Sequence, residues 1–127
     1  MSLLLDSHAL LWAMDDSDRL GAQARAALAT ERDEIAISAA TIWELGIKRA
    51  HGGVVLPDDF VAKVVEAGFR ILVAAPSLCW KAAHLPPHHG DPFDRLIIAQ
   101  ALEASMTIMT SDAIFSRYGV KVVSASR

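Results

Sequence analysis

Acidic residues that follow short apolar runs are the features of this 127-residue sequence most suggestive of chemistry. Asp6 follows the run Leu3–Leu5, and Asp112 closes a short Thr-Ser turn after the run Thr107–Met109. In a parallel sheet, residues just past neighbouring strands meet at one edge. Carboxylates suit a hard divalent cation, and the chain has neither a P-loop nor a glycine-rich dinucleotide motif that would bind phosphate. Since Asp also caps helices well, capping remains the alternative for both residues.

A third group of acids lies in the segment 91–101. Asp91 and Pro92 occupy the N-cap and first positions of an expected helix, so capping is the preferred interpretation of Asp91. Asp94 falls at the third helical position, beside the apolar stripe expected to be buried. That stripe contains Phe93, Ile97, Ala101 and Ala104. A carboxylate next to the core needs a cation or hydrogen-bond donors, so metal binding and a helix-dipole role are equally open for Asp94.

Glu44 and the histidine pair are weaker candidates. Glu44 lies off the centre of the apolar stripe of an expected helix, and Lys48 follows four residues later, which favours an exposed Glu–Lys pair. The stripe of that helix contains Ile42, Trp43, Gly46, Ile47 and Ala50. His88 and His89 lie in a loop rich in Pro and Gly. Because adjacent residues rarely ligate one ion, a solvated loop is the preferred interpretation of this pair.

The remaining aromatic and sulfur side chains are expected to be structural. Trp12, Trp43 and Trp80 fall in apolar helical patterns, which favours core or interface positions over stacking on nucleic-acid bases. Cys79 is the single cysteine, so an internal disulfide and a cysteine-based zinc site are excluded, and it is expected to be buried. His51 and His84 are expected at helix ends, beside the negative end of the dipole.

The elements that position these residues alternate between strand and helix. Five short apolar runs are expected to be strands, namely Leu3–Leu5, Ile35–Ile37, Ile71–Val73, Thr107–Met109 and Val120–Val123. Helical spacing occurs over Ala9–Met14, Leu20–Ala29, Ala39–His51, Phe60–Ala67, Leu78–His84, Pro92–Ser105 and Ala113–Tyr118. Runs that are apolar throughout indicate strands covered on both faces. The pattern therefore predicts an α/β fold, a three-layer α/β/α sandwich around a parallel sheet of about five strands.

Size and charge limit the classes of protein. A chain of 127 residues has the length of one domain, so residues 1–127 are expected to form a single domain with its own core. The net charge of −3 excludes a general basic coat of the kind that binds nucleic acid by charge alone. Met1–Leu5 is expected to be a strand rather than a signal peptide, and no apolar run is long enough to span a bilayer. A cytoplasmic location and no membrane association are expected.

Taken together, these motifs resemble the PIN-domain nucleases, and specifically the VapC toxins of bacterial toxin–antitoxin pairs. Three stretches carry the likeness besides the segment 91–101, which is the most specific match. They are Leu3-Leu4-Leu5-Asp6-Ser7-His8, Ser38-Ala39-Ala40-Thr41-Ile42-Trp43-Glu44-Leu45 and Thr110-Ser111-Asp112. The resemblance implies a sheet with strand order 3-2-1-4-5. It also implies that Asp6, Glu44, Asp94 and Asp112 form one acidic cluster, with Asp6 and Asp94 as the principal metal ligands.

The function implied by this resemblance is that of an endoribonuclease toxin. Water activated by Mg²⁺ or Mn²⁺ would hydrolyse RNA phosphodiester bonds, with the four acids as the catalytic and metal-binding residues. The resemblance also implies a cognate antitoxin and a homodimer. Lys48, Arg49 and Arg95 are expected to hold flanking phosphates, with ordinary surface solvation as the alternative. The competing hypothesis is a catalytically silent binding module whose acids only cap helices.

Overall fold

The computed structural model describes residues 2–30 and 34–127, in which five parallel strands form one sheet. The strands are β1 (Leu3–Leu5), β2 (Ile35–Ser38), β3 (Arg70–Leu72), β4 (Thr107–Thr110) and β5 (Val122–Ser124). Their order is β3-β2-β1-β4-β5, so the predicted topology is confirmed. Met1, which the sequence assigns to the first strand segment, lies outside the described residues.

Helices follow the strands as the spacing of apolar residues predicts. They are α1 (Ser7–Met14), α2 (Ala22–Thr30), α3 (Ala39–Ala50), α4 (Phe60–Glu66), α5 (Pro76–Ala83), α6 (Pro92–Ala104) and the 3-10 helix η1 (Ala113–Tyr118). Each helix overlaps its predicted range and differs from it by at most two residues at either end. His51 and His84 are the C-caps of α3 and α5, where their Nδ1 atoms lie 2.9 and 2.8 Å from carbonyl oxygens of the last turns.

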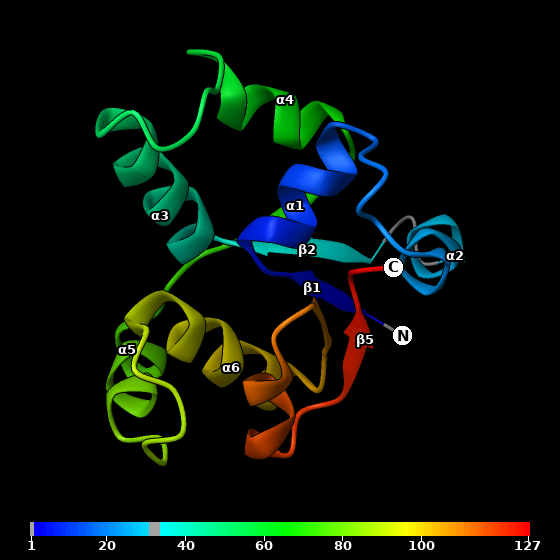
Figure 1. Cartoon of the computed structure of the whole chain (residues 1–127). Coiled ribbons are helices and arrows are strands. Elements are labelled where there is room, and N and C mark those ends of the chain that lie inside the picture. The colour runs from blue at the N-terminus through cyan, green and yellow to red at the C-terminus, as the bar shows by residue number, and fades with distance from the viewer. Residues whose placement is uncertain (1, 31–33) are drawn as a thin grey trace.

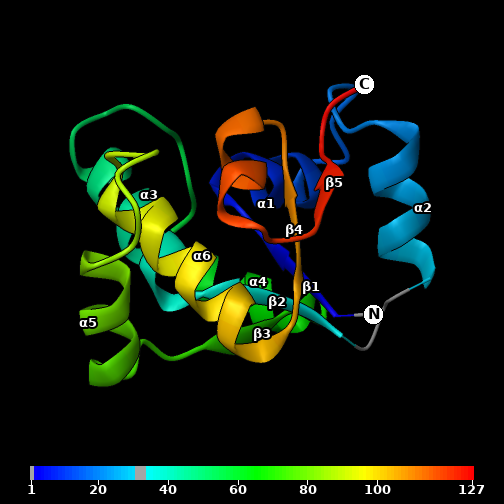
Figure 2. The ribbon, with the colours of Figure 1, turned by 90° about the horizontal axis from the view of Figure 1, so that it is seen from below.

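Helices lie on both faces of the sheet (Figures 1 and 2), and an apolar core lies on each face. On one face, Leu3 and Leu5 of β1 pack with side chains of α1, α2 and α4. On the other face, Leu4 packs with α6 and η1, because successive side chains of a strand point to opposite sides. Helix α5 packs on the outer side of α6 through Leu78 and Ala82, so it adds to the second helical layer without covering the strands. The three-layer sandwich is confirmed.

The edge strands differ from the prediction. The central strands β1, β2 and β4 are buried throughout, whereas β3 and β5 are partly exposed, so coverage on both faces is wrong for the two edges. Strand β3 ends at Leu72 and leaves Val73 78% exposed. Val120 is buried but lies in the turn after Gly119, whose φ of +75° ends η1, and β5 begins only at Val122. An apolar residue near a sheet edge can therefore be buried in the core while it lies in a turn rather than in a strand.

Helix α3 presents a different face to the protein from the one its apolar residues predict. The buried residues are Ala40, Thr41, Glu44 and Leu45. Trp43 and Ile47 of the predicted stripe are 66% and 38% exposed. The helix is turned so that the Glu44 carboxylate faces inward, and this leaves apolar side chains on the surface of the chain. Periodicity alone cannot detect such a rotation, since it assumes that the most apolar face is the buried one.

Further exposed side chains lie on α5. Cys79 is exposed, so the expectation of a buried thiol is wrong. Trp80 is 70% exposed, and Trp43 and Trp80 are therefore not core residues of this chain. An apolar pocket of about 430 Å³ opens between α3, α5 and α6, lined in part by Trp43, Cys79 and Phe93. Within residues 2–30 and 34–127, no helix has the length and apolar character needed to cross a membrane.

Candidate functional site

Asp6 and Asp112 meet at the carboxyl edge of the sheet because β1 and β4 are parallel neighbours. The backbone N–H of Asp6 continues the ladder by donating to the Met109 carbonyl at 3.2 Å. Both aspartates are N-caps, as predicted. Oδ1 of Asp6 accepts from the Ala9 N–H at 2.9 Å, and Oδ1 of Asp112 accepts from the Ile114 N–H at 3.0 Å. Capping therefore uses one oxygen of each carboxylate and leaves the other oxygen for different contacts.

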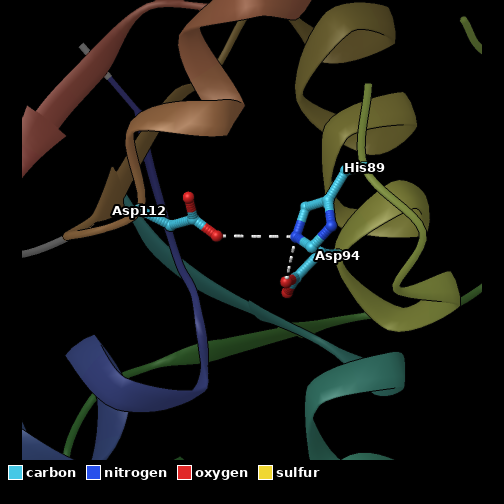
Figure 3. A group of neighbouring side chains, drawn as sticks. All are labelled: His89, Asp94 and Asp112. Carbon is cyan, nitrogen blue, oxygen red and sulfur yellow. Dashed lines mark hydrogen bonds and ion pairs between the residues drawn. The ribbon is translucent and has the colours of Figure 1, made fainter. Parts of the chain in front are cut away.

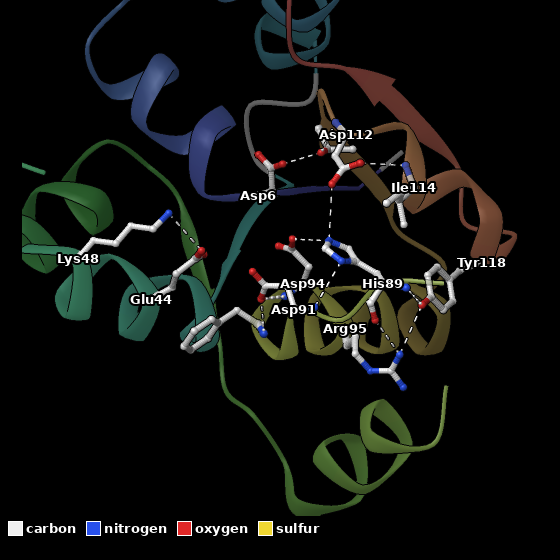
Figure 4. Close-up of polar contacts among 12 residues, drawn as sticks. Asp6, Glu44, Lys48, His89, Asp91, Asp94, Arg95, Asp112, Ile114 and Tyr118 are labelled. Carbon is white, nitrogen blue, oxygen red and sulfur yellow. Dashed lines mark hydrogen bonds and ion pairs between the residues drawn. The ribbon is translucent and has the colours of Figure 1, made fainter. Parts of the chain in front are cut away.

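The second oxygens of these two carboxylates are linked to the site through other groups (Figure 4). Oδ2 of Asp6 accepts from the Thr110 hydroxyl at 2.5 Å, and the same hydroxyl accepts from the Asp112 N–H at 3.1 Å. Oδ2 of Asp112 lies 3.6 Å from Nε2 of His89. Burial raises the pKa of Asp6 above its ordinary value, while the hydrogen bonds from Thr110 and from the Ala9 N–H oppose the shift. The Thr110 hydroxyl thus connects two acids of the cluster.

Asp94 enters the cluster from the first turn of α6. The helix begins as predicted: Asp91 caps it by accepting from the N–H groups of Phe93 and Asp94 at 2.8 and 3.2 Å. Asp94 is left free of capping, and its Oδ2 accepts a 2.8 Å hydrogen bond from His89. Burial and the neighbouring charge of Asp91 raise the pKa of Asp94 to about 7, against the opposing effect of His89. A cation bound beside this carboxylate would favour its ionised form.

Glu44 is a buried member of the cluster, only 8% exposed. Its Oε2 lies 3.3 Å from Nζ of Lys48, so the predicted Glu–Lys pair exists, but the expectation that it is exposed is wrong for Glu44. Oε1 is buried and has no hydrogen-bond partner among the described residues. The charge of Glu44 is the smallest of the contributions that raise the pKa of Asp6 and of Asp94. A buried acceptor without a donor is unfavourable unless something else binds it.

His89 belongs to the site, contrary to the prediction of a solvated loop. Its side chain is 15% exposed and lies between Asp94 and Asp112, whereas the adjacent His88 is exposed as predicted (Figure 3). The ring packs edge-on against Phe115 with the centroids 5.9 Å apart. The signal in the sequence is a histidine pair just before the helix start at Asp91. That pattern does not show which ring turns inward.

Arg95 explains how the loop is held. Its guanidinium donates to carbonyl oxygens along the segment 82–89, including those of Leu85 at 2.7 Å and His89 at 3.0 Å. The Tyr118 hydroxyl accepts from the His89 N–H at 2.8 Å and donates to the Pro86 carbonyl at 2.7 Å. The guanidinium is thus engaged by the protein itself, so the expectation that Arg95 holds phosphates is wrong. Arg95 positions the loop that carries His89.

The geometry fits a divalent cation. One ligand atom each from His89, Asp94 and Asp112 lies within 4.8 Å of the other two, and Asp6 and Glu44 add carboxylates beside them. Mutually repelling carboxylates with raised pKa values and an acceptor without a donor are groups that a cation would stabilise. The carboxylate oxygens of this set suit Mg²⁺ or Mn²⁺, which keep several waters and need few protein ligands. Of the four predicted acids, Asp94 and Asp112 thus lie within ligand distance of each other and of His89, Asp6 is joined to Asp112 through the Thr110 hydroxyl, and Glu44 lies nearby.

Comparisons with known proteins agree with this architecture. The sequence matches the PIN domain family model over residues 3–121. It is 31% identical over 114 residues to ribonuclease VapC22 of Mycobacterium tuberculosis, with 87% of each chain covered. The fold is similar to VapBC2 of Rickettsia felis bound to a promoter DNA fragment (TM-score 0.71, 16% identity, 98% of each chain). It is also similar to M. tuberculosis VapC20, a toxin that cleaves the sarcin–ricin loop (TM-score 0.67, 15% identity, 94% and 96% of the two chains).

Proposed function

Because this chain belongs to the PIN domain family, we propose that it is a divalent-metal-dependent endoribonuclease that acts as the toxin of a toxin–antitoxin pair. The homology to ribonuclease VapC22 supports RNA as the substrate class. The likeness to the chains of a VapBC complex supports an antitoxin as the partner. We also propose that residues 1–127 form one PIN domain, since the family match spans residues 3–121.

The observation that carries the proposal is the convergence of four carboxylates from four elements on one edge of the sheet. Asp6 and Asp112 come from the ends of neighbouring strands, Glu44 from α3 and Asp94 from α6. Oε1 of Glu44 is buried without a donor among the described residues, and the pKa values of Asp6 and Asp94 are raised. These features disfavour the cluster in the absence of a cation, which is the signature of a functional site.

The residues divide into ligands and groups that orient them. Asp6 and Asp94 would be the principal metal ligands, with Glu44 and Asp112 acting directly or through water. A bound divalent cation would lower the pKa of a water molecule and stabilise the charge that develops on the phosphate. Thr110 fixes the orientation of Asp6, and Asp91 caps α6 so that Asp94 projects from its first turn. The protein therefore supplies a rigid set of oxygen ligands on regular elements.

Basic residues near α3 would hold the RNA backbone on either side of the cut. Nζ of Lys48 lies 3.3 Å from Glu44, so it is close to the acidic cluster and can contact a phosphate there. Arg49, near the end of the same helix, pairs with the exposed Asp58 of the segment before α4. Such contacts position a nucleic acid without reading its sequence. An acidic protein can handle RNA in this way because the cation supplies positive charge at the scissile phosphate.

The exposed apolar side chains support the proposal that this chain binds other proteins. Trp43 and Trp80 are 66% and 70% exposed, and Trp43 lines the apolar pocket between α3, α5 and α6. Aromatic residues exposed around a pocket are typical of protein interfaces. We therefore retain the homodimer and the cognate antitoxin as proposed partners of this chain.

Helix capping by Asp6, Asp91 and Asp112 favours the alternative of a silent binding module. Two features argue against it. Asp94 and Glu44 cap no helix, yet both carboxylates are turned into the cluster. The capping aspartates Asp6 and Asp112 also use only one oxygen as a cap. Capping alone therefore does not account for the arrangement.

The decisive experiment measures cleavage of labelled single-stranded and hairpin RNAs by purified protein with Mg²⁺ or Mn²⁺, and with EDTA as the metal-free control. The variants D6N and D94N should lose cleavage by at least about a hundredfold while remaining folded, because asparagine at position 6 is still an adequate N-cap and Asp94 caps no helix. D18N is the matched control, since Asp18 is exposed on the segment between α1 and α2 and is not one of the acids of the cluster. Full activity in the D6N/D94N double variant would exclude the proposal and favour the silent module.

A further inference from the structure

We propose that His89 is a metal ligand of this site through Nε2, and that this imidazole makes the site prefer Mn²⁺ over Mg²⁺. The inference rests on the proposed metal-dependent function and adds to it a nitrogen donor that the acidic motifs do not predict. It assigns the histidine loop a direct role in choosing the cation. The argument depends on where the ring lies, how it is held and what surrounds it.

The position of the ring fits shared coordination. Nε2 lies 2.8 Å from Oδ2 of Asp94 and 3.6 Å from Oδ2 of Asp112. Two ligand atoms that are each about 2.1–2.3 Å from one ion lie about 3.0–3.3 Å apart when they are adjacent in an octahedral coordination sphere. The spacings around Nε2 are close to this range, and Figure 3 shows the ring directed at both carboxylates. One cation can therefore contact all three side chains after small side-chain shifts.

The backbone of His89 is held at both of its polar groups. Its N–H donates to the Tyr118 hydroxyl at 2.8 Å, and its carbonyl accepts from Arg95 at 3.0 Å. Arg95 also donates to the carbonyls of Ala82, Ala83, Leu85 and Pro86. A flexible loop would have to lose entropy to bring a ring to a metal, whereas this loop is already ordered by a single guanidinium. The imidazole is thus preorganised beside the two carboxylates.

Glu44 provides an independent indication that a cation binds here. Glu44 is 92% buried, and its Oε1 has no hydrogen-bond partner in the described part of the chain. Its charge makes a small contribution to the raised pKa of Asp6 and of Asp94, and Figure 4 shows Glu44 on the side of the site where these two acids lie. A histidine among acids could serve only as their hydrogen-bond donor. The unsatisfied Glu44 oxygen shows that this donor does not satisfy the cluster.

The ring must change tautomer when it ligates. When Asp94 is ionised, the 2.8 Å contact with its Oδ2 requires a hydrogen on Nε2, and Nδ1 then faces the Asp91 N–H at 3.4 Å. Ligation requires a free lone pair on Nε2, so the hydrogen moves to Nδ1 by exchange with solvent. A contact of 3.4 Å is at the limit of hydrogen bonding, so little stabilisation of the metal-free tautomer is lost. In this tautomer the Nδ1–H of His89 and the Asp91 N–H face each other, and a small rotation of the ring separates these two donors.

A nitrogen ligand alters the selectivity of the site. Mg²⁺ prefers an all-oxygen octahedron and retains its waters, so an imidazole adds little to its binding. Mn²⁺ binds the same carboxylates. Like the other first-row divalent ions, it has a higher affinity than Mg²⁺ for nitrogen ligands. The mixed set of one imidazole and several carboxylates should therefore bind Mn²⁺ more tightly than Mg²⁺, by a margin that depends on His89.

Calorimetric titration of the metal-free full chain with Mn²⁺ and with Mg²⁺ tests this dependence. H89A should weaken Mn²⁺ binding by at least about tenfold and change Mg²⁺ binding by less than about threefold. H88A is the matched control, because His88 is exposed in the same loop, and it should leave both affinities unchanged. Equal losses for the two ions, unchanged Mn²⁺ binding or tighter Mn²⁺ binding in H89A would each overturn the proposal. Tighter binding would identify His89 as a competitor of the cation.

A spectroscopic measurement on the wild-type protein avoids reliance on a variant that fails to fold. Electron spin echo modulation of bound Mn²⁺ should contain the nitrogen couplings of one ligating imidazole, and H88A should retain them. Their absence in the wild-type protein would overturn the assignment. Neither readout involves RNA, so a protein that binds Mn²⁺ through His89 but cuts no RNA would contradict the proposed nuclease alone. Loss of Mn²⁺ binding in D94N but not in H89A would contradict the inference alone.

Discussion

The Thr110 hydroxyl donates a 2.5 Å hydrogen bond to Oδ2 of Asp6, across 104 positions of sequence. Both residues are buried, and the same hydroxyl also accepts from the Asp112 N–H. One side chain at the end of β4 thereby sets the orientation of an acid at the end of β1 and the backbone of a second acid. The relationship exists because β1 and β4 are parallel neighbours in the sheet.

Replacing Thr110 should separate orientation of the site from its charge. T110V keeps the shape but removes the hydroxyl, so we expect a further rise in the pKa of Asp6 and a loss of about 1–3 kcal/mol in the free energy of unfolding. Metal affinity and RNA cleavage should fall by about tenfold or more. T110S retains the hydroxyl and should restore most of both. Wild-type metal affinity in T110V, measured by calorimetry, would contradict this role.

The raised pKa of Asp94 predicts a pH-dependent effect of neutralising it. Its pKa moves from an ordinary 3.8 to about 7 in the folded, metal-free protein. Between these values the native state binds more protons than the unfolded state, so the free energy of unfolding falls as the pH rises. D94N should therefore be more stable than wild type at pH 8, on the order of 1–4 kcal/mol, and similar to it near pH 4. Urea denaturation at both pH values in EDTA checks this sign.

Added metal should stabilise the wild-type protein more as the pH rises, which is the opposite of the pH dependence of the metal-free protein. A cation competes with the proton on Asp94, whose pKa lies near 7, so binding strengthens as the pH rises through that value. A given excess of Mn²⁺ should therefore raise the melting temperature by several degrees more at pH 8 than at pH 6, through mass action. EDTA should reverse the effect. An equal increase at both pH values would mean that Asp94 is not a ligand.

Arg95 should matter for the histidine loop rather than for RNA contacts. R95M removes charged donors from several carbonyls of the segment 82–89, and we expect a loss of about 3 kcal/mol in the free energy of unfolding. R95K keeps the charge but lacks the planar array of donors, so it should recover only part of that stability. Hydrogen exchange should show faster exchange of the His89 amide in both variants. Wild-type stability with weakened RNA binding would instead support a phosphate contact.

The exposed face of α3 should contribute to association but little to folding. Trp43 is 66% exposed, so W43S should change the free energy of unfolding by less than about 1 kcal/mol. If the proposed homodimer uses this face, W43S should weaken self-association by about tenfold or more in sedimentation equilibrium. V65S is the matched control, since Val65 is a 56% exposed apolar residue on α4. Equal dissociation constants for W43S and V65S would assign the dimer to another surface.

Much of the fold could be predicted from the sequence because local patterns agree with it. The central strands are short apolar runs. Helix α6 begins at an Asp91–Pro92 pair, and these residue types are favoured at the N-cap and the first position of a helix. The bounds and burial of the edge strands are predicted less accurately, because burial at an edge depends on what lies beyond the sheet. The predicted buried face of α3 is wrong because periodicity assumes that the most apolar face is buried, whereas the buried face here carries Glu44, which pairs with Lys48 of the same helix.

The site was predictable where an acid follows a strand or a helix start, as for Asp6, Asp94 and Asp112. His89 was missed for a physical reason. Its position results from Arg95 and Tyr118, which hold the backbone of a loop that has no periodic pattern of its own. Which member of a histidine pair turns inward is decided by those tertiary contacts. The metal-binding roles of the acids and of His89 remain predictions until the cation is measured.

The central position of β1, between β2 and β4, delays assembly of the acidic edge of the sheet during protein synthesis. A ribosome that has released α5 has already produced Asp6 and Glu44, but Asp94 and Asp112 are still unmade or inside the exit tunnel. Strand β1 then lacks one of its two neighbours, and half of the acids are missing. A growing chain therefore completes this group of acids only after β4 has emerged and joined the sheet beside β1.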